Sequence, residues 1–66
     1  MDFAYAMKRV TKGDIALRKG WDGSGYIVKG NSHPMFMQNG TWDMQRWVPS
    51  FEDIFATDWV ATESKD

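Results

Sequence analysis

No cross-link is available to this chain, because its 66 residues include no cysteine and a single histidine, His33. A structural zinc site needs thiolates or several imidazoles, so disulfides and zinc are both excluded. A domain of this size buries only about 60% of the surface that its unfolded chain exposes. Natural chains below roughly 70 to 80 residues usually compensate by cross-linking or self-association. We therefore expect one domain over residues 1–61 and a frayed tail over 62–66. We also expect the chain to form a homo-oligomer.

The charges of the chain are balanced and dispersed. Eight basic and nine acidic residues give a formal net charge of −1, and no sustained basic stripe is available for a phosphate backbone. Binding of DNA or RNA is therefore disfavoured. No apolar run approaches the ~18 residues that a membrane span needs. We expect a cytoplasmic protein with neither a nucleic-acid nor a membrane partner.

Hydrophobic periodicity predicts an α+β fold with a small antiparallel sheet. Asp2 can cap a first helix in which Phe3, Met7 and Val10 share a face, and Lys12-Gly13 can end it. A glycine-rich loop is expected over 20–25. Strands are expected over 15–18, 26–29, from residue 35, and over 57–61.

Asn39-Gly40 is the strongest local signal, because these residues accept the positive φ angles of a two-residue type I′ hairpin. The resulting register pairs residue 38 with 41, 37 with 42, 36 with 43 and 35 with 44. Alternation then places an apolar set on one face, namely Met35, Met37, Trp42 and Met44.

A second short helix is predicted before the last strand. Ser50 followed three residues later by Asp53 resembles a capping box. Phe51, Ile54 and Phe55 then form an apolar stripe at helical spacing.

Catalysis finds little support. His33 precedes a proline in a turn and has no nucleophile motif nearby, which favours a solvated loop. Glu52 and Asp53 are adjacent on the predicted helix, where neighbours do not share a face, so capping and solubilising roles are favoured. The glycines of 20–25 lack the spacing of a phosphate-binding loop. We expect no enzymatic activity, no metal site and no cofactor.

Aromatic residues are abundant, with ten Phe, Trp and Tyr residues of which four are Trp. Such rings build cores and interfaces and also stack on bases. Arg18 can form charge-assisted hydrogen bonds with a phosphate while the nearby Trp21 indole stacks on a base. A core or interface tryptophan with Arg18 lying over it explains the same pair. Core or interface roles are also the first interpretation for Trp42, Trp47 and Trp59, so the residues alone leave both roles open.

Two terminal motifs resemble those of one family of small phage proteins, the second type of Thoeris anti-defence proteins. The first consists of Asp2-Phe3, Ala6-Met7, Gly13, Ala16, Arg18 and Gly20-Trp21-Asp22-Gly23. The second is the continuous segment 47–59, with an Asp-x-x-Ala-x-Asp-Trp spacing at Asp53, Ala56, Asp58 and Trp59. They occur in the right order and cover about half of the chain.

Members of that family look like sponges that bind the cyclic ADP-ribose-derived signal of TIR-domain proteins without cleaving it. Binding blocks a bacterial abortive-infection response. They assemble as tetramers with pockets between subunits, and some also hold cyclic dinucleotides. The resemblance therefore implies a non-enzymatic homotetramer in the host cytoplasm whose partner is a cyclic nucleotide.

Under this resemblance we expect the ligand contacts to come from Arg18, Trp21, Asp22, Trp47 and Ser50. A sponge must hold its ligand near nanomolar Kd, worth about 12 kcal/mol. Stacking supplies about 1 to 3 kcal/mol per base, so phosphate contacts must add to it. Asp22 stands where family members often have asparagine, and its carboxylate repels a diphosphate unless it points away.

Two further features bear on function. The segment 26–34 is shorter than in many family members, so we expect part of the usual pocket wall to be absent. The alternative function class is a protein-interaction module whose exposed aromatic residues bind a host protein.

Overall fold

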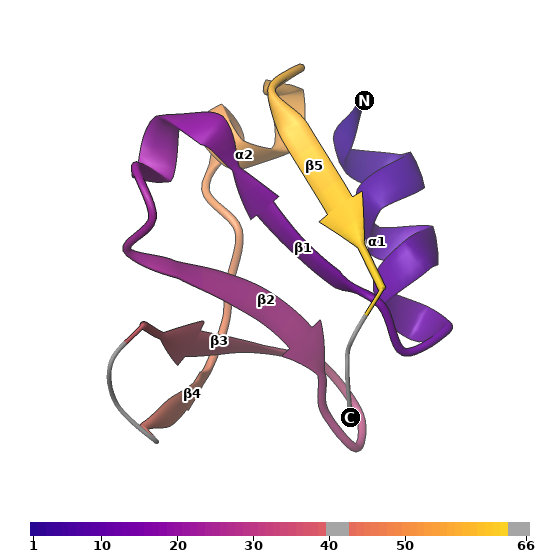
Figure 1. The fold of residues 1–66 in the computed structure, drawn as a ribbon. Coiled ribbons are helices and arrows are strands. Elements are labelled where there is room, and N and C mark those ends of the chain that lie inside the picture. Colours follow the sequence, from indigo (N-terminus) through magenta and orange to yellow (C-terminus); the bar gives the residue numbers. More distant parts are fainter. Residues whose placement is uncertain (40–42, 64–66) are drawn as a thin grey trace.

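The computed structural model describes residues 1–39 and 43–63, and over this part of the chain two helices accompany a five-stranded antiparallel sheet (Figure 1). The elements follow the order α1 (Phe3–Thr11), β1 (Ile15–Arg18), the 3-10 turn η1 (Lys19–Trp21), β2 (Gly25–Lys29), β3 (Pro34–Gln38), β4 (Met44–Arg46), α2 (Phe51–Phe55) and β5 (Trp59–Thr62). The sheet has the strand order β4-β3-β2-β1-β5. This architecture is consistent with the predicted α+β class.

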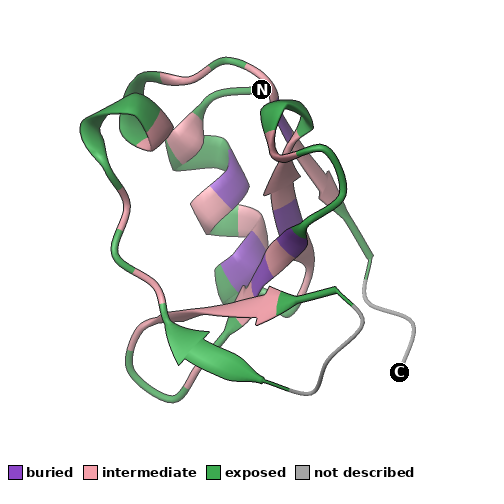
Figure 2. Ribbon diagram, turned by 90° about the vertical axis from the view of Figure 1, so that its left-hand side faces the viewer, coloured by how far each residue is buried: buried purple, intermediate pink, exposed green. Residues whose placement is uncertain are grey.

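Helix α1 forms where the sequence predicts it. The Asp2 side chain accepts the Tyr5 backbone N–H at 2.9 Å, and Gly13 takes a φ of 100° after the last turn. Ala6 and Val10 are buried against the sheet (Figure 2). The small side chain of Ala6 allows α1 to approach β1 closely, and Ala16 of that strand is also fully buried.

The ladder register assigns alternate strand residues to two faces of the sheet. Ala16 pairs with Ile27 and Ile27 with Phe36, so these three side chains share the face that α1 covers. Arg18 pairs with Trp59, which belongs to the same face. The buried core of the described residues is small and consists of Ala6, Val10, Ala16, Ile27 and Trp59.

The opposite face of the sheet is also apolar. Ladder partners point to the same side, and the pairs on this side are Leu17 with Val60, Tyr26 with Met37, and Val28 with Met35. Helix α1 contacts the other face, and α2 meets that face too, where its Asp53 carbonyl accepts the Trp59 indole N–H at 2.9 Å. Neither described helix therefore covers these side chains, although a solvated sheet face is usually polar.

The hairpin of β3 and β4 is present, but its register differs from the predicted one by two residues. Met37 pairs with Met44, whereas the two-residue turn predicted residue 42 as its partner. The shift is even, so Met35, Met37 and Met44 keep the shared face that the sequence predicted.

Asn39 explains the longer connection. Its side chain donates to the Gly23 carbonyl, and its backbone N–H donates to the Ser24 carbonyl at 3.0 Å. Asn39 therefore binds the glycine-rich loop and is not free to close a two-residue turn. The other predicted hairpin residues, Gly40, Thr41 and Trp42, lie outside the described residues, as does the 64–66 part of the predicted tail.

The glycine-rich loop is partly regular, because η1 adds one 3-10 turn where the sequence predicts an irregular loop. Asp22 and Gly23 then reverse the chain with positive φ angles of 54° and 78°. β2 starts at Gly25, where an added Cβ would lie 2.4 Å from the Phe36 ring. This close approach explains why only glycine fits there.

Helix α2 has the predicted capping box. The Asp53 backbone N–H donates to Ser50 Oγ at 3.2 Å, and the Ser50 backbone N–H donates to Asp53 Oδ2 at 3.1 Å. The apolar stripe of this helix does not enter the core, however. Phe51 and Phe55 are 81% and 80% exposed.

Candidate functional site

Three tryptophans far apart in the sequence meet on the core side of the sheet. The ring centroids are 5.3 Å apart for Trp21 and Trp59, 5.9 Å for Trp47 and Trp59, and 6.3 Å for Trp21 and Trp47, each pair edge to face. This geometry is the preferred one for aromatic pairs. Trp59 is only 2% exposed, so it is a core residue. Trp21 and Trp47 are half-buried and offer surface to a ligand.

An ion network beside the tryptophans fixes the turn that carries Trp21. Arg18 Nε donates to Asp58 Oδ1 at 2.8 Å, and Arg18 Nη1 donates to Asp53 Oδ1 at 3.0 Å. The second oxygen of Asp58 accepts the Gly20 backbone N–H at 2.9 Å. The network therefore joins β1, η1, α2 and the start of β5.

The same network explains the second terminal motif. Asp53 caps α2 and pairs with Arg18, whereas Asp58 pairs with Arg18 and holds η1. Trp59 packs in the core and bonds the Asp53 carbonyl through its indole N–H. These motif positions build the scaffold of the site.

The network lowers the pKa of both carboxyl groups. The hydrogen bond from Arg18, then the one from the Gly20 N–H, lowers the pKa of Asp58. For Asp53 burial acts to raise the pKa, but the bonds from Ser50 and Arg18 outweigh it and the pKa is lowered. The hydrogen bonds that Arg18 donates to Asp58 and Asp53 raise the pKa of Arg18. All three groups are therefore charged at neutral pH.

Trp21 and Trp47 line an open cavity of about 390 Å³. The other lining residues are Ser24, Phe36, Gln45, Arg46, Val48 and Asp53. Arg46 is exposed and makes no ion pair with any described residue, unlike Arg18, whose side chain is 14% exposed. We name this space the Trp21–Trp47 cavity. It combines indole surface with a guanidinium, an amide and a hydroxyl group.

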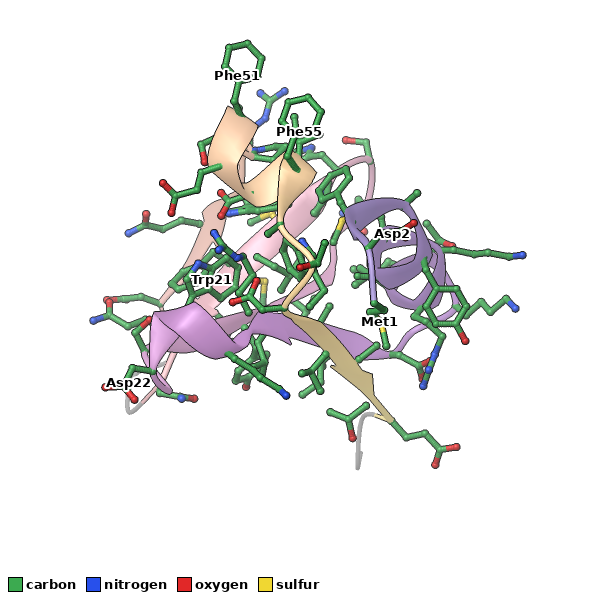
Figure 3. All side chains as sticks on the ribbon, turned by 90° about the horizontal axis from the view of Figure 1, so that it is seen from above. Met1, Asp2, Trp21, Asp22, Phe51 and Phe55 are labelled. Atoms are coloured by element: carbon green, nitrogen blue, oxygen red, sulfur yellow. The ribbon has the colours of Figure 1, made fainter. Side chains whose placement is uncertain are left out.

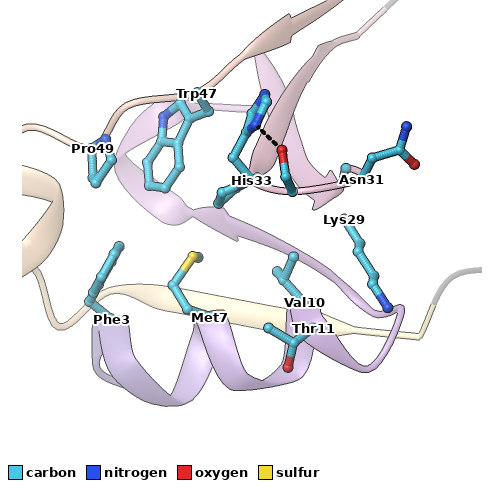
Figure 4. Close-up of a pocket in the computed structure, with 12 residues that line it drawn as sticks. Phe3, Met7, Val10, Thr11, Lys29, Asn31, His33, Trp47 and Pro49 are labelled. Carbon is cyan, nitrogen blue, oxygen red and sulfur yellow. Dashed lines mark hydrogen bonds between the residues drawn. The ribbon is translucent and has the colours of Figure 1, made fainter.

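A second cavity, of about 460 Å³, lies on the other side of Trp47 (Figure 4). Phe3 and Met7 of α1 face Trp47 and Pro49 across it, and its polar end carries Lys29, Asn31 and His33. The His33 ring nitrogen Nδ1 lies 3.0 Å from the Ser32 hydroxyl. We name this second space the α1 groove. Trp47 lines both cavities.

The structure brings together two of the five predicted contact residues, Trp21 and Trp47. Arg18 lines neither of the two cavities, because its guanidinium is held by Asp53 and Asp58. Ser50 caps α2 and also lines neither. Asp22 lies at the periphery, with its side chain directed away from Trp21 (Figure 3).

Sequence reasoning missed Arg46 and Gln45. Both precede Trp47 directly, so a cation and an amide beside a tryptophan were available as a signal. The predicted hairpin register ends at Met44, so it gives neither Gln45 nor Arg46 a partner or a face. The observed register places Gln45 opposite Phe36, on the face that carries the tryptophans.

Over residues 1–39 and 43–63, no three His, Asp or Glu side chains converge in a way that suits a metal ion. Neither helix in this part of the chain has the length and apolar character that a membrane crossing requires.

The chain was compared with known proteins. No curated protein and no solved structure matches it. A family model does match, namely the Tad2-like model of the Thoeris anti-defense 2-like domain, over residues 1–62 of the 66. Because the match covers nearly the whole chain, and as the two terminal motifs predicted, this protein belongs to the Thoeris anti-defense 2-like family.

Proposed function

We propose that this anti-defence protein is a phage protein that binds and sequesters a cyclic nucleotide immune signal in the host cytoplasm, without cleaving it, and so blocks Thoeris-type immunity. The proposed ligand is a glyco-cyclic ADP-ribose or, in a related form, a cyclic dinucleotide. The observation that carries the proposal is the Trp21–Trp47 cavity, in which two half-buried indoles lie beside Arg46, a guanidinium without an ion-pair partner among the described residues.

The chemistry of this cavity suits the ligand class. Such a ligand carries a base, ribose hydroxyls and phosphates. An indole stacks on the base, and Arg46 forms charge-assisted hydrogen bonds with a phosphate. Gln45 and Ser24 offer hydrogen bonds to the hydroxyls. Asp22 points away, so its charge does not oppose a phosphate bound in this cavity.

Arg18 has a positioning role in this proposal. It holds Asp58, which in turn holds Gly20 in the turn that carries Trp21. It also neutralises Asp53, a carboxylate that lines the cavity. An unpaired carboxylate there would repel the phosphates of the ligand.

Retention without turnover fits the same geometry. Among the described residues, Asp53 is the only carboxyl group that lines the Trp21–Trp47 cavity, and it is hydrogen-bonded to Arg18 and to Ser50. Its lowered pKa keeps it ionised and paired, which makes it a poor general acid or base near neutral pH.

The cavity is open, and we propose that a homotetramer completes it. A site that encloses a nucleotide-sized ligand takes roughly 300 to 1,000 Å³ and buries most of the ligand. The volume of about 390 Å³ is at the low end of that range, and one chain leaves one side of the ligand in water. Self-association also compensates for the small core and for the uncovered apolar sheet face that Leu17, Val28 and Met37 contribute to.

The deciding experiment is uptake and release. The purified protein is incubated with glyco-cyclic ADP-ribose, freed of unbound ligand, heated, and the released compound is analysed by mass spectrometry. Intact ligand in stoichiometric amount supports the sponge. Altered ligand would show an enzyme. No uptake would favour the protein-interaction module.

A further inference from the structure

We propose that Phe51 and Phe55 form a self-association surface, and that this α2 aromatic pair inserts into the α1 groove of a second copy of the chain. The inference rests on the proposed function in one respect, because it names the contact by which a second copy approaches the Trp21–Trp47 cavity. It concerns assembly and is tested without any nucleotide.

The α2 aromatic pair has no partner within the described part of the chain that buries it. The two residues are four positions apart, which puts them on one side of the helix. They are 81% and 80% exposed, and both rings project away from the body of the molecule (Figure 3). A phenylalanine offers about 200 Å², so roughly 320 Å² of ring surface faces water. This area is within the range of the largest apolar patch on a typical monomer, and such a patch is often functional.

The α1 groove has the character that such rings need. Apolar atoms of Phe3, Met7, Val10, Trp47 and Pro49 form most of its wall (Figure 4). An apolar cavity of about 150 Å³ is enough to hold one benzene ring. The groove, at about 460 Å³, exceeds that volume. The Phe3 and Trp47 rings already contact each other, with centroids 6.2 Å apart, so an inserted ring would pack alongside this pair and not between its members. A nucleotide suits it less well, because its polar residues are confined to one end.

Charge complementarity favours a second copy as the occupant. Glu52 lies between the two phenylalanines in the sequence, and its carboxylate is 3.7 Å from Arg18 Nη1. The Glu52 side chain is 84% exposed, so this long contact contributes little and leaves the carboxylate accessible to a second cation. Lys29 lies at the polar end of the groove, is exposed, and makes no ion pair with any described residue. When α2 of one copy enters the groove of another, the two opposite charges can meet at the rim, which favours correct orientation.

The position of the two surfaces allows a closed pair. The groove wall at Trp47 and Pro49 is separated from α2 by one residue, Ser50, so the groove and the α2 aromatic pair are neighbours. Two copies related by a two-fold axis can therefore each insert the α2 aromatic pair into the α1 groove of the other. Such an isologous contact closes the dimer and does not propagate into a fibre. Because Trp47 lines both cavities, a second copy bound in the α1 groove lies next to the edge of the Trp21–Trp47 cavity.

The first test removes the aromatic pair. The doubly substituted chain, Phe51→Ser with Phe55→Ser, is compared with the unchanged protein by analytical ultracentrifugation and native mass spectrometry. We expect the assembly to lose one association step, so that the particle mass falls by half and the association constant by at least tenfold. Circular dichroism verifies that the fold is kept, as expected for side chains this exposed.

A matched control is Tyr5→Ser. Tyr5 is 49% exposed on α1, on the side of the helix opposite to the stripe that lines the groove. This variant should assemble like the unchanged protein. Unaltered assembly of the double phenylalanine variant, or equal loss in the Tyr5 variant, would overturn the proposal.

The second test locates the contact by cross-linking, which the absence of native cysteine makes clean. Chains carrying Glu52→Cys and chains carrying Lys29→Cys are mixed and treated with a mild oxidant. Disulfide-linked pairs that contain one chain of each kind are expected. Links only between two Glu52→Cys chains would show α2 against α2, and no mixed link in an assembled sample would also reject the groove.

The two proposals fail separately. Assembly through the α2 aromatic pair without uptake of either glyco-cyclic ADP-ribose or a cyclic dinucleotide would refute the proposed function and leave the contact standing. Ligand uptake by a protein whose assembly state is unchanged by the phenylalanine substitutions would refute the contact and leave the function standing.

Discussion

Arg18 and Asp58 lie 40 positions apart in the sequence and form an ion pair with 2.8 Å between Nε and Oδ1. Asp58 also accepts the Gly20 backbone N–H, so the pair joins the end of β1 to the turn that carries Trp21. An added Cβ at Gly20 would lie 3.3 Å from Asp58 Oδ2, which shows how closely the turn is held. An arginine that donates to two different carboxylates, with a side chain only 14% exposed, is a positioning device.

Loss of Arg18 is predicted to reduce stability and, through Trp21, ligand affinity. In Arg18→Met, Asp53 and Asp58 lose their cation, and two close carboxylates then repel each other. Thermal unfolding should show a lower Tm, and calorimetry with glyco-cyclic ADP-ribose should show weaker binding. Arg18→Lys should recover only part of both losses, because an ammonium cannot form the same forked contact. Wild-type stability in Arg18→Met would contradict the positioning role.

Stability is predicted to fall in acid because of the same carboxylates. The pKa values of Asp53 and Asp58 are lower in the folded chain than the ordinary value of 3.8. Protonation therefore favours the unfolded chain, so their contribution is fully present above that value and is lost as the pH falls through the folded pKa values. Urea unfolding measured from neutral pH to about pH 2 should show this loss.

Asp58→Asn supplies the comparison for the pH series. This variant should be less stable at neutral pH and should show a flatter dependence below about pH 4, since one of the linked groups is gone. Asp22→Asn is the matched control, because Asp22 is exposed and makes no ion pair with any described residue. An identical pH profile for Asp58→Asn and the unchanged protein would rule out the linkage.

The contrast between Asp2 and Asn39 shows what the sequence could predict. The cap at Asp2 and the capping box at Ser50 depend on residues within four positions, and both form as predicted. Asn39 also has a strong local preference, but a contact with Gly23, 16 positions away, determines its conformation. The predicted two-residue turn failed because this tertiary bond competes with the local one.

Arg18 and Phe51 show the same limit at the site. The sequence indicates that Arg18 is important but not which partner it has, since the pairing with Asp58 depends on the β1–β5 ladder. The spacing of Phe51 and Phe55 predicts a helix face, and only the packing of α2 shows that this face is turned to solvent. Motif position indicates Trp21 and Trp47 as site residues, and the fold places their ring centroids 6.3 Å apart.

Ser50→Ala is predicted to destabilise the protein mildly. Loss of an N-cap side chain costs about 1 kcal/mol, which lowers the Tm of a domain of this size by roughly 4 to 8 °C. Ser50→Asn keeps a capping acceptor and adds no charge beside Asp53, so it should retain most of the stability. Ligand affinity, measured by calorimetry below the lowered Tm, should be unchanged in both variants, because Ser50 does not line the Trp21–Trp47 cavity. If Ser50→Ala alone lost much of its ligand affinity, Ser50 would contact the ligand, as the sequence predicted.

Arg46→Gln is predicted to weaken ligand binding while the fold stays intact. Arg46 is exposed on the edge strand β4, so its replacement should change the Tm little. A hydrogen bond to a charged group contributes about 1.5 to 3 kcal/mol, which corresponds to roughly a 10- to 150-fold rise in Kd. The wild-type affinity should also fall with added salt more steeply than that of the variant, because one phosphate contact is lost.

Lys12→Gln removes the same charge from the exposed end of α1 and controls for the net charge of the chain. Trp21→Leu removes stacking, which is worth about 1 to 3 kcal/mol, with less damage to the core than an alanine would cause. If the cavity binds the signal as proposed, Arg46→Gln and Trp21→Leu lose affinity in calorimetry and Lys12→Gln does not. If all three variants bound the ligand as tightly as the unchanged protein, the Trp21–Trp47 cavity would not be the binding site. Neither the Trp21 ring nor the Arg46 guanidinium would then contact the ligand.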